Sequence, residues 1–367
     1  MALGYVETSS AKIATPADPL LLRAGGRLDH VEVAYETYGT LAPARDNVVF
    51  ICHALTGDAH AAGLHVGHKR RGWWDNMIGP GKPVDTDRFF VVSANMLGGC
   101  SGTTGPSSVD PATGRRYGLD FPLLHMGDIV ETYRRLLRHL GVERLYAALG
   151  GSLGGMQVLQ WVIDAPAQMD RALLVAASGR ISTENIAFSS VGREAIMSDP
   201  DFHNGRYAEA GVVPARGLKI ARMMAHITYV SSGSLETKFG HRRRSEAPMS
   251  LDADFEVEHY LQHQGSSFVD RFDALTYLYL TRVLDYFDPF GEPGTAGALA
   301  ATRTRFQVTS FDSDWRFSTA QSLAGVTALR EHGVDVDFAE IVSPYGHDSF
   351  LLEPAGYHER IASFLDS

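Results

Sequence analysis

A serine between glycines, at the junction of a strand-like run and a helix-like run, constrains this chain more than any other feature. Residues 145–149 are apolar and strand-like, residues 150–154 read Gly-Gly-Ser-Leu-Gly, and a helical pattern follows from residue 156. In this context a G-x-S-x-G segment predicts a sharp turn that presents the serine as a nucleophile, because only small neighbours let strand and helix pack closely. Without such flanking elements the segment would be a plain glycine-rich loop. We therefore predict that Ser152 is a catalytic nucleophile.

Strand-like and helical patterns alternate in the first and last parts of the chain. Between several of the strands we expect helices at residues 129–140, 156–163 and 320–332. The short apolar, β-branched runs predict strands at residues 31–38, 47–52, 89–93, 145–149, 172–176, 305–309 and 336–342. This alternation predicts an α/β fold with a mostly parallel central sheet covered on both faces.

The alternation stops between about residues 179 and 293. This stretch has no strand-like run and shows helical patterns at residues 187–197, 216–229, 255–264 and 269–286. We interpret residues 181–296 as a helical lid inserted into an α/β core, which is formed by residues 1–180 and 297–367.

Charge and cysteine content exclude several classes of partner. The 367 residues include 43 acidic and 33 basic ones, for a net charge of −10, which repels nucleic acids and anionic membranes. Cys52 and Cys100 are too few for a disulfide framework, and no signal peptide or apolar run of membrane-spanning length is present. We expect a cytoplasmic protein with no nucleic-acid or membrane partner.

A serine nucleophile needs a histidine base and an acid that orients it. Following a nucleophile turn of this kind, the acid and then the histidine come in loops after later strands. His347 follows the predicted strand at residues 336–342, and both Asp312 and Asp314 follow the one at residues 305–309. The spacing alone does not separate the two aspartates, and each could instead be a turn residue.

Two backbone N–H groups are needed to stabilise the oxyanion of the tetrahedral intermediate. Leu153, directly after the nucleophile, is one candidate donor. The loop at residues 53–57 follows an earlier predicted strand, which makes the N–H of Leu55 the other candidate. A simple polar turn is the alternative for this loop.

Other candidate sites are weaker. Cys100 lies in a glycine-rich loop with no predicted helix N-terminus or histidine beside it, so we interpret it as a structural thiol. His60, His65 and His68 lack the i, i+4 spacing of helical metal ligands, and we predict no metal site there.

In these residues and in several further motifs, the chain resembles the homoserine O-acyltransferases of the α/β-hydrolase superfamily, which activate homoserine for methionine synthesis. The similarity extends over nearly the whole chain. It rests on Tyr-Glu-Thr-Tyr-Gly at residues 35–39, His-Ala-Leu-Thr-Gly at 53–57, Gly-Trp-Trp-Asp at 72–75, Leu-Gly-Gly-Cys at 97–100, Gly-Ser-Leu-Gly-Gly-Met-Gln at 151–157, Asn-Ile-Ala-Phe at 185–188, Ala-His-Ile-Thr-Tyr at 225–229 and Gly-His-Asp at 346–348.

The resemblance implies roles that spacing leaves open. In this family the triad aspartate precedes a tryptophan, which selects Asp314. Arg222 and Asp348 are implied as substrate contacts, and their charges suit the carboxylate and ammonium groups of an amino acid. The family uses acyl-CoA as a co-substrate and requires no metal or prosthetic group. By the same analogy we expect a homodimer.

The acyl group is acetyl in some members and succinyl in others. Residues 314–318 read Asp-Trp-Arg-Phe-Ser, which looks like the succinyl-using members, and Arg316 is the candidate for recognising the second carboxylate of succinyl. We therefore expect a homoserine O-succinyltransferase with L-homoserine and succinyl-CoA as substrates. A homoserine O-acetyltransferase using acetyl-CoA is the first alternative, and a serine esterase or thioesterase the second.

Overall fold

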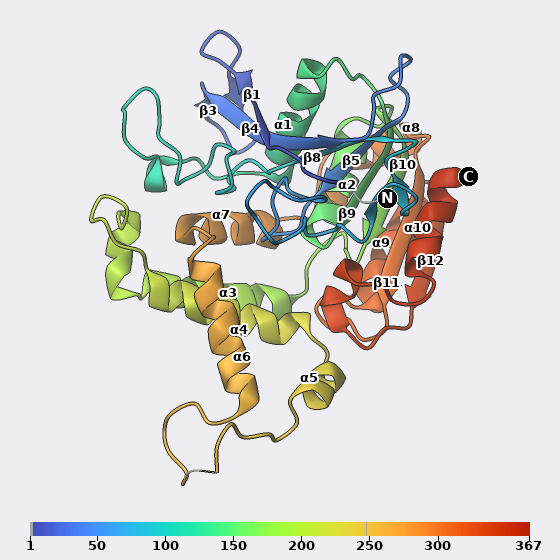
Figure 1. Cartoon of the computed structure of the whole chain (residues 1–367). Helices are drawn as coiled ribbons and strands as arrows, with labels where there is room; N and C mark the ends of the chain where they lie inside the picture. Colours follow the sequence, from blue (N-terminus) through green and yellow to red (C-terminus); the bar gives the residue numbers. More distant parts are fainter. Residues whose placement is uncertain (1–2, 247) are drawn as a thin grey trace.

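The computed structural model describes residues 3–246 and 248–367 (Figure 1). Residues 1–2 of the predicted core and residue 247 of the predicted lid lie outside the described part of the chain. An eight-stranded sheet forms the centre of the molecule. Its strands, in spatial order, are β1 (Ser9–Ala14), β4 (Val31–Tyr38), β8 (Phe90–Ala94), β5 (Val48–Cys52), β9 (Leu145–Gly151), β10 (Met169–Val175), β11 (Arg305–Phe311) and β12 (Val336–Ile341).

The sheet confirms the predicted mostly parallel α/β fold. β4 pairs antiparallel with β1 and with β8, and every other neighbouring pair is parallel. All seven predicted strands lie in this sheet, within a few residues of their expected bounds. β1 was not predicted, because Ser9, Ser10 and Lys12 of this edge strand face solvent and the strand lacks an apolar run. Two short pairs were not predicted either: β2 (Leu20–Leu21) with β3 (Arg27–Leu28), and β6 (Ile78–Gly79) with β7 (Val84–Asp85).

Helices cover both faces of the sheet because successive strand residues point to opposite sides. On β5, the Phe50 ring lies 4.8 Å from that of Tyr133 in α1 (Met126–His139) and 4.9 Å from that of Trp161 in α2 (Leu153–Asp164). Its neighbours Val49 and Ile51 belong to the core on the other face, which α10 (Tyr357–Asp366) covers. α9 (Thr319–Glu331) lies on the same face as α1 and α2.

The chain between β10 and β11 forms the helical insertion, most of which lies in the lower half of Figure 1, while its last helix lies at the upper right. The insertion begins after β10 and ends before β11, and these two strands are neighbours in the sheet. The predicted boundary at residue 181 precedes the first helix, and that at residue 296 falls inside the last. The helices are α3 (Thr183–Met197), α4 (Ala215–Tyr229), α5 (Ser232–Lys238), α6 (Glu256–Val269), α7 (Ala274–Asp285) and α8 (Thr295–Ala301).

The single helix expected at residues 269–286 is wrong in its first part. α6 ends at Val269, the chain turns, and α7 begins at Ala274. Asp273 is the reason, since its carboxylate accepts a hydrogen bond from the backbone N–H of Thr276 at 2.9 Å and caps the start of α7. The turn at residues 270–273 carries Arg271.

Within the described residues, no helix combines the length and the apolar character needed to cross a bilayer.

Candidate active site

Ser152 occupies the turn between β9 and α2 in a strained backbone conformation. Its φ of 57° and ψ of −127° are unusual for a residue with a side chain. The neighbouring glycines make this turn possible. A Cβ atom on Gly154 would lie 2.1 Å from the carbonyl oxygen of Cys52, and one on Gly151 would lie 2.3 Å from the ring of Phe350. The G-x-S-x-G segment therefore forms the close strand–helix turn expected from the sequence.

Ser152, His347 and Asp314 form one line of hydrogen bonds. His347 Nε2 lies 2.8 Å from Ser152 Oγ, and its Nδ1 lies 2.7 Å from Asp314 Oδ2. The three residues follow β9, β12 and β11, whose carboxyl ends lie at the same edge of the sheet. With the Nδ1–H donating to the carboxylate, Nε2 is free to accept the serine proton. The arrangement is chemically suited to nucleophilic acyl transfer.

The structure places Asp314, and not Asp312, against His347. The other oxygen of Asp314, Oδ1, accepts hydrogen bonds from the backbone N–H groups of Arg316 at 3.0 Å and Phe317 at 2.9 Å. Asp312 instead accepts the N–H of Ser343 at 2.8 Å, which ties the loop after β11 to the loop after β12.

Leu55 and Leu153 lie together on the wall of the cavity above Ser152. Leu153 is the first residue of α2, where backbone N–H groups have no partner within the helix. The loop carrying Leu55 is fixed by His53, whose ring accepts the N–H of Met96 at 3.0 Å and whose carbonyl accepts from Gln157 at 3.1 Å. Both leucines therefore line the cavity that contains Ser152, and their role as oxyanion donors stays a prediction.

Arg222 and Asp348 line the same cavity of about 270 Å³ as Ser152. Nε and Nη1 of Arg222 are buried without a hydrogen-bond partner among the described residues, and its guanidinium lies over the ring of Phe268 at 4.7 Å. Burial raises the pKa of Asp348, although the charges of His347 and Arg222 oppose the shift. The cation of Arg222 and the carboxyl group of Asp348 therefore line the same cavity as the nucleophile Ser152.

Arg316 is buried rather than exposed, with 6% of its surface accessible. It lines the Ser152 cavity, its Nη1 donates to Thr228 Oγ1 at 2.6 Å, and its guanidinium lies 5.2 Å from the centre of the Tyr229 ring. Within the described part of the chain it forms no ion pair, whereas the equally buried Arg193 pairs with Asp285 at 2.7 Å. The cavity thus contains a second cation without a carboxylate partner.

The remaining candidates from the sequence lie outside the Ser152 cavity. Burial raises the pKa of the Cys100 thiol, which disfavours the nucleophilic thiolate. His60 Nδ1 and His65 Nε2 contact the buried Glu36 at 3.1 and 2.7 Å, and these three residues form a group of metal-ligand type that the histidine spacing did not predict. The same carboxylate also accepts hydrogen bonds from Thr8 and Tyr38, both at 2.8 Å, so both of its oxygens already have partners.

Other residues of the cavity walls were missed as well. Thr56, Arg70 and Tyr229 line the Ser152 cavity, and Arg271 lines a second cavity next to it. Arg70 could have been noticed, because the segment His-Lys-Arg-Arg at residues 68–71 is strongly basic in an acidic chain. Arg271 carried no such signal, since it was assigned to the interior of a helix.

Comparisons with known proteins agree with this geometry. A family model described as the alpha/beta hydrolase fold matches residues 47–354. A homoserine O-succinyltransferase from Nocardioides sp. is 74% identical, over 99% of this chain and 99% of its own length. The crystal structure of homoserine O-acetyltransferase from Bacillus anthracis has a TM-score of 0.90 at 26% identity, covering 99% of this chain and 98% of that one. That of esterase E22 has a TM-score of 0.88 at 27% identity, covering 98% and 100%.

The resemblance stated from the sequence motifs is thereby confirmed by two independent kinds of similarity. The family model covers most of the chain, and the relative from Nocardioides sp. aligns along its whole length. The chain belongs to the homoserine O-acyltransferase family of the α/β-hydrolase fold.

Proposed function

We propose that this protein transfers the succinyl group of succinyl-CoA to the side-chain hydroxyl of L-homoserine, as a step of methionine biosynthesis. The reaction proceeds through an acyl-enzyme on Ser152. The proposal is supported by the hydrogen-bonded line from Ser152 through His347 to Asp314, and by the name of the 74% identical relative.

In the first half-reaction His347 takes the proton of Ser152 as the serine oxygen attacks the thioester carbonyl. The N–H groups of Leu55 and Leu153 stabilise the tetrahedral oxyanion. His347 then returns the proton to the departing CoA thiolate, and the succinyl group stays on Ser152 as an ester. Asp314 holds the imidazole in the required orientation and stabilises the imidazolium.

In the second half-reaction L-homoserine replaces CoA in the cavity. Arg222 binds the α-carboxylate and Asp348 the α-ammonium, so the hydroxyl is directed at the acyl-enzyme. His347 removes the hydroxyl proton as the homoserine oxygen attacks the acyl carbonyl, whose oxyanion is stabilised at the same site. His347 then returns the proton to Ser152 Oγ as the bond between Ser152 and the succinyl group breaks. Release of CoA before homoserine enters gives ping-pong kinetics.

The main support for succinyl rather than acetyl as the transferred group is Arg316, a buried cation without an ion-pair partner in the Ser152 cavity. A cation removed from water without an ion-pair partner is costly, and the distal carboxylate of succinyl would supply that partner. Acetyl has no such group. A side-by-side assay of succinyl-CoA and acetyl-CoA with homoserine tests the choice, and a preference for acetyl-CoA would establish the acetyltransferase alternative.

The Arg316→Leu variant should separate the two donors. A charge-assisted hydrogen bond contributes on the order of 1.5–3 kcal/mol, so kcat/KM for succinyl-CoA should fall roughly 10- to 150-fold. The rate with acetyl-CoA should stay unchanged or rise. Arg316→Lys, which keeps the charge, should retain part of the preference. If Arg316→Leu slows both donors alike, Arg316 only supports the Asp314 loop.

The Arg222→Ala variant should acylate normally and transfer slowly, because Arg222 is assigned to the acceptor rather than to the thioester. We expect the transfer step to slow by roughly 10- to 150-fold, the loss of one charge-assisted contact. Single-turnover measurements of the two half-reactions check this division. An equal loss in both steps would contradict it.

Hydrolysis is the second candidate, since the same triad releases a free acid when water reaches the acyl-enzyme. The structural similarity to esterase E22 supports hydrolysis as the second candidate function. Product analysis with and without homoserine separates the two: a transferase forms O-succinylhomoserine, and an esterase forms succinate at the same rate in both mixtures.

The proposal extends to cofactors, location and assembly. The steps above use only side chains and backbone groups of this chain, with acyl-CoA as co-substrate and no metal or prosthetic group. Cys52 and Cys100 are unpaired, as suits the reducing cytoplasm where we place the protein. A homodimer is proposed on the family resemblance alone.

A further inference from the structure

A second cavity, of about 260 Å³, adjoins the one that contains Ser152. The two share a wall formed by Ala54, Thr56, Arg70, Arg222, Phe350 and Leu351. We call the cavity that contains Ser152 the inner cavity. When the thioester carbonyl of the donor lies beside Ser152, the rest of the donor molecule must extend out of this inner cavity. The second cavity, which we call the outer cavity, provides space for it.

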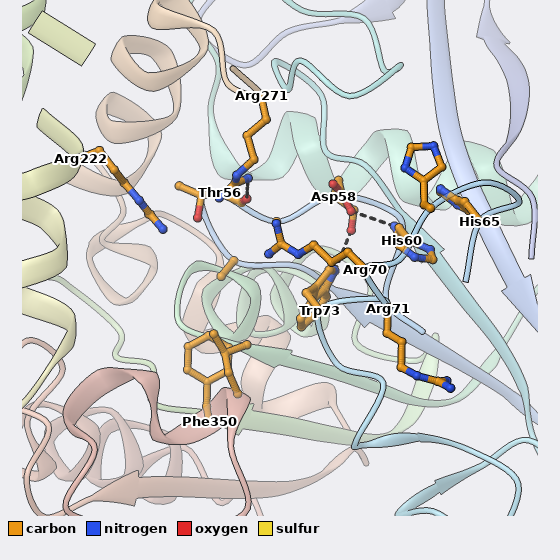
Figure 2. Close-up of a pocket in the computed structure, with 14 residues that line it drawn as sticks. Thr56, Asp58, His60, His65, Arg70, Arg71, Trp73, Arg222, Arg271 and Phe350 are labelled. Atoms are coloured by element: carbon orange, nitrogen blue, oxygen red, sulfur yellow. Dashed lines mark hydrogen bonds between the residues drawn. The ribbon is translucent and has the colours of Figure 1, made fainter. Parts of the chain in front are cut away.

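Cations from different parts of the fold line the outer cavity. Figure 2 shows Arg222 from α4, Arg271 from the turn before α7 and Arg70 from the loop between β5 and β6 directed at the same space. Arg71 also lines this cavity, but its charge is paired with Asp75 at 3.3 Å. Of the described residues that line this cavity, Asp58 is the one carboxylate. This concentration of positive charge stands in a chain of net charge −10.

Arg271 is fixed at its place on the cavity wall. Its Nη1 donates to the carbonyl oxygen of Thr56 at 3.0 Å, and its guanidinium lies 5.1 Å from the centre of the Phe268 ring, which Arg222 also approaches at 4.7 Å. Burial and the charges of Arg222 and Arg70 lower the pKa of Arg271 to about 10. It therefore stays charged at neutral pH, although its neighbours are also cations.

Arg70 has no partner of its own among the described residues, since no hydrogen bond or ion pair of its side chain occurs there. Arg70, Arg222 and Arg271 outnumber the single carboxylate of Asp58, so like charges repel one another in this cavity, and a bound anion would reduce that repulsion. Arginine is also well suited to phosphate, because its planar fork donates two parallel hydrogen bonds to phosphate oxygens. The outer cavity thus has the chemistry of a phosphate site.

We propose that Arg70 and Arg271 form a subsite for the phosphate groups of acyl-CoA at the entrance to the catalytic cavity, an inference that rests on the proposed function. The thioester end of the donor occupies the inner cavity beside Ser152. The flexible pantetheine arm passes along the shared wall, and the negatively charged nucleotide end reaches the two arginines. Arg222 remains with the acceptor amino acid.

The double variant Arg70→Gln/Arg271→Gln tests the subsite. We expect the second-order rate constant for acylation of Ser152 by succinyl-CoA to fall about tenfold per arginine, the loss typical of one charge-assisted hydrogen bond. Acylation by the succinyl thioester of N-acetylcysteamine, which has no phosphate, should fall by a much smaller factor, because this donor loses no phosphate contact. The exposed Arg115 lies outside both cavities, so Arg115→Gln is the charge-matched control and should behave as wild type with both donors.

Binding measurements make the test independent of acyl transfer. Calorimetry with adenosine 3′,5′-bisphosphate, which has phosphates and no thioester, should show weaker binding to the double variant than to wild type and the Arg115→Gln control. Equal affinity, or an equal loss of acylation with both thioesters, would overturn the subsite. The proposed function is judged separately, because it fails if the succinylated wild-type enzyme does not transfer its acyl group to homoserine.

Discussion

The Ser152→Ala variant should take up no acyl group, and turnover should fall on the order of 10⁶-fold, as expected when nucleophile and base act as one unit. The side chain of Ser152 contacts His347 at 2.8 Å, and alanine takes up less space at the same backbone position. The fold should therefore be preserved. His347→Ala should be nearly as damaging, because an unactivated serine hydroxyl is a weak nucleophile at neutral pH.

Mass spectrometry of the intact protein after incubation with succinyl-CoA measures this directly. Wild type should gain the mass of one succinyl group, and Ser152→Ala should gain none. Ser107→Ala, in a loop outside both cavities, is the matched control and should be acylated as wild type. A succinyl adduct on Ser152→Ala would show that another residue is the nucleophile.

The Asp314→Asn variant should lose about 10⁴-fold in kcat, the effect known for a triad whose histidine is held in the wrong tautomer. Asp314 Oδ1 accepts two backbone N–H groups, from Arg316 and Phe317. An asparagine must direct its carbonyl oxygen at those donors, so its NH₂ group faces His347 Nδ1. His347 then carries its proton on Nε2 and cannot accept the proton of Ser152.

Asp312→Asn provides the comparison for this prediction. Asp312 accepts one backbone N–H, from Ser343 at 2.8 Å, and an asparagine oxygen can accept the same bond. We expect kcat to change by less than about tenfold, since a neutral hydrogen bond contributes only about 1 kcal/mol. Steady-state assays of both variants suffice. Equal losses would mean that the histidine is not oriented by Asp314 alone.

The nucleophile turn and the sheet could be predicted because their causes are local. The glycines around Ser152 and the apolar strand before it leave few alternatives, and the structure forms the expected turn. The choice between Asp312 and Asp314 was different. The two aspartates lie two residues apart in one loop, and only Asp314 faces His347. Which of them does so depends on how the loops after β11 and β12 pack together.

The contributions of Arg70 and Arg271 to the cavity walls could not be predicted, for the same physical reason. Arg70 and Arg271 are 201 positions apart in the chain and meet only after the insertion has folded against the core. Arg271 was hidden further by the cap at Asp273, which begins a new helix where periodicity alone predicts a continuous one. Burial of Arg316 likewise depends on Thr228 and Tyr229, contributed by α4.

The insertion of the helical segment between neighbouring strands has an evolutionary consequence. Because β10 and β11 lie side by side, the chain leaves and rejoins the core at adjacent points, and the loops that carry Ser152, Asp314 and His347 all belong to the core. Arg222 and Arg271 belong to the insertion. Mutations in the inserted helices can therefore alter which molecules enter without disturbing the bond-breaking groups. Descendants of one ancestral scaffold can exchange acceptors, water included, while inheriting the same chemistry.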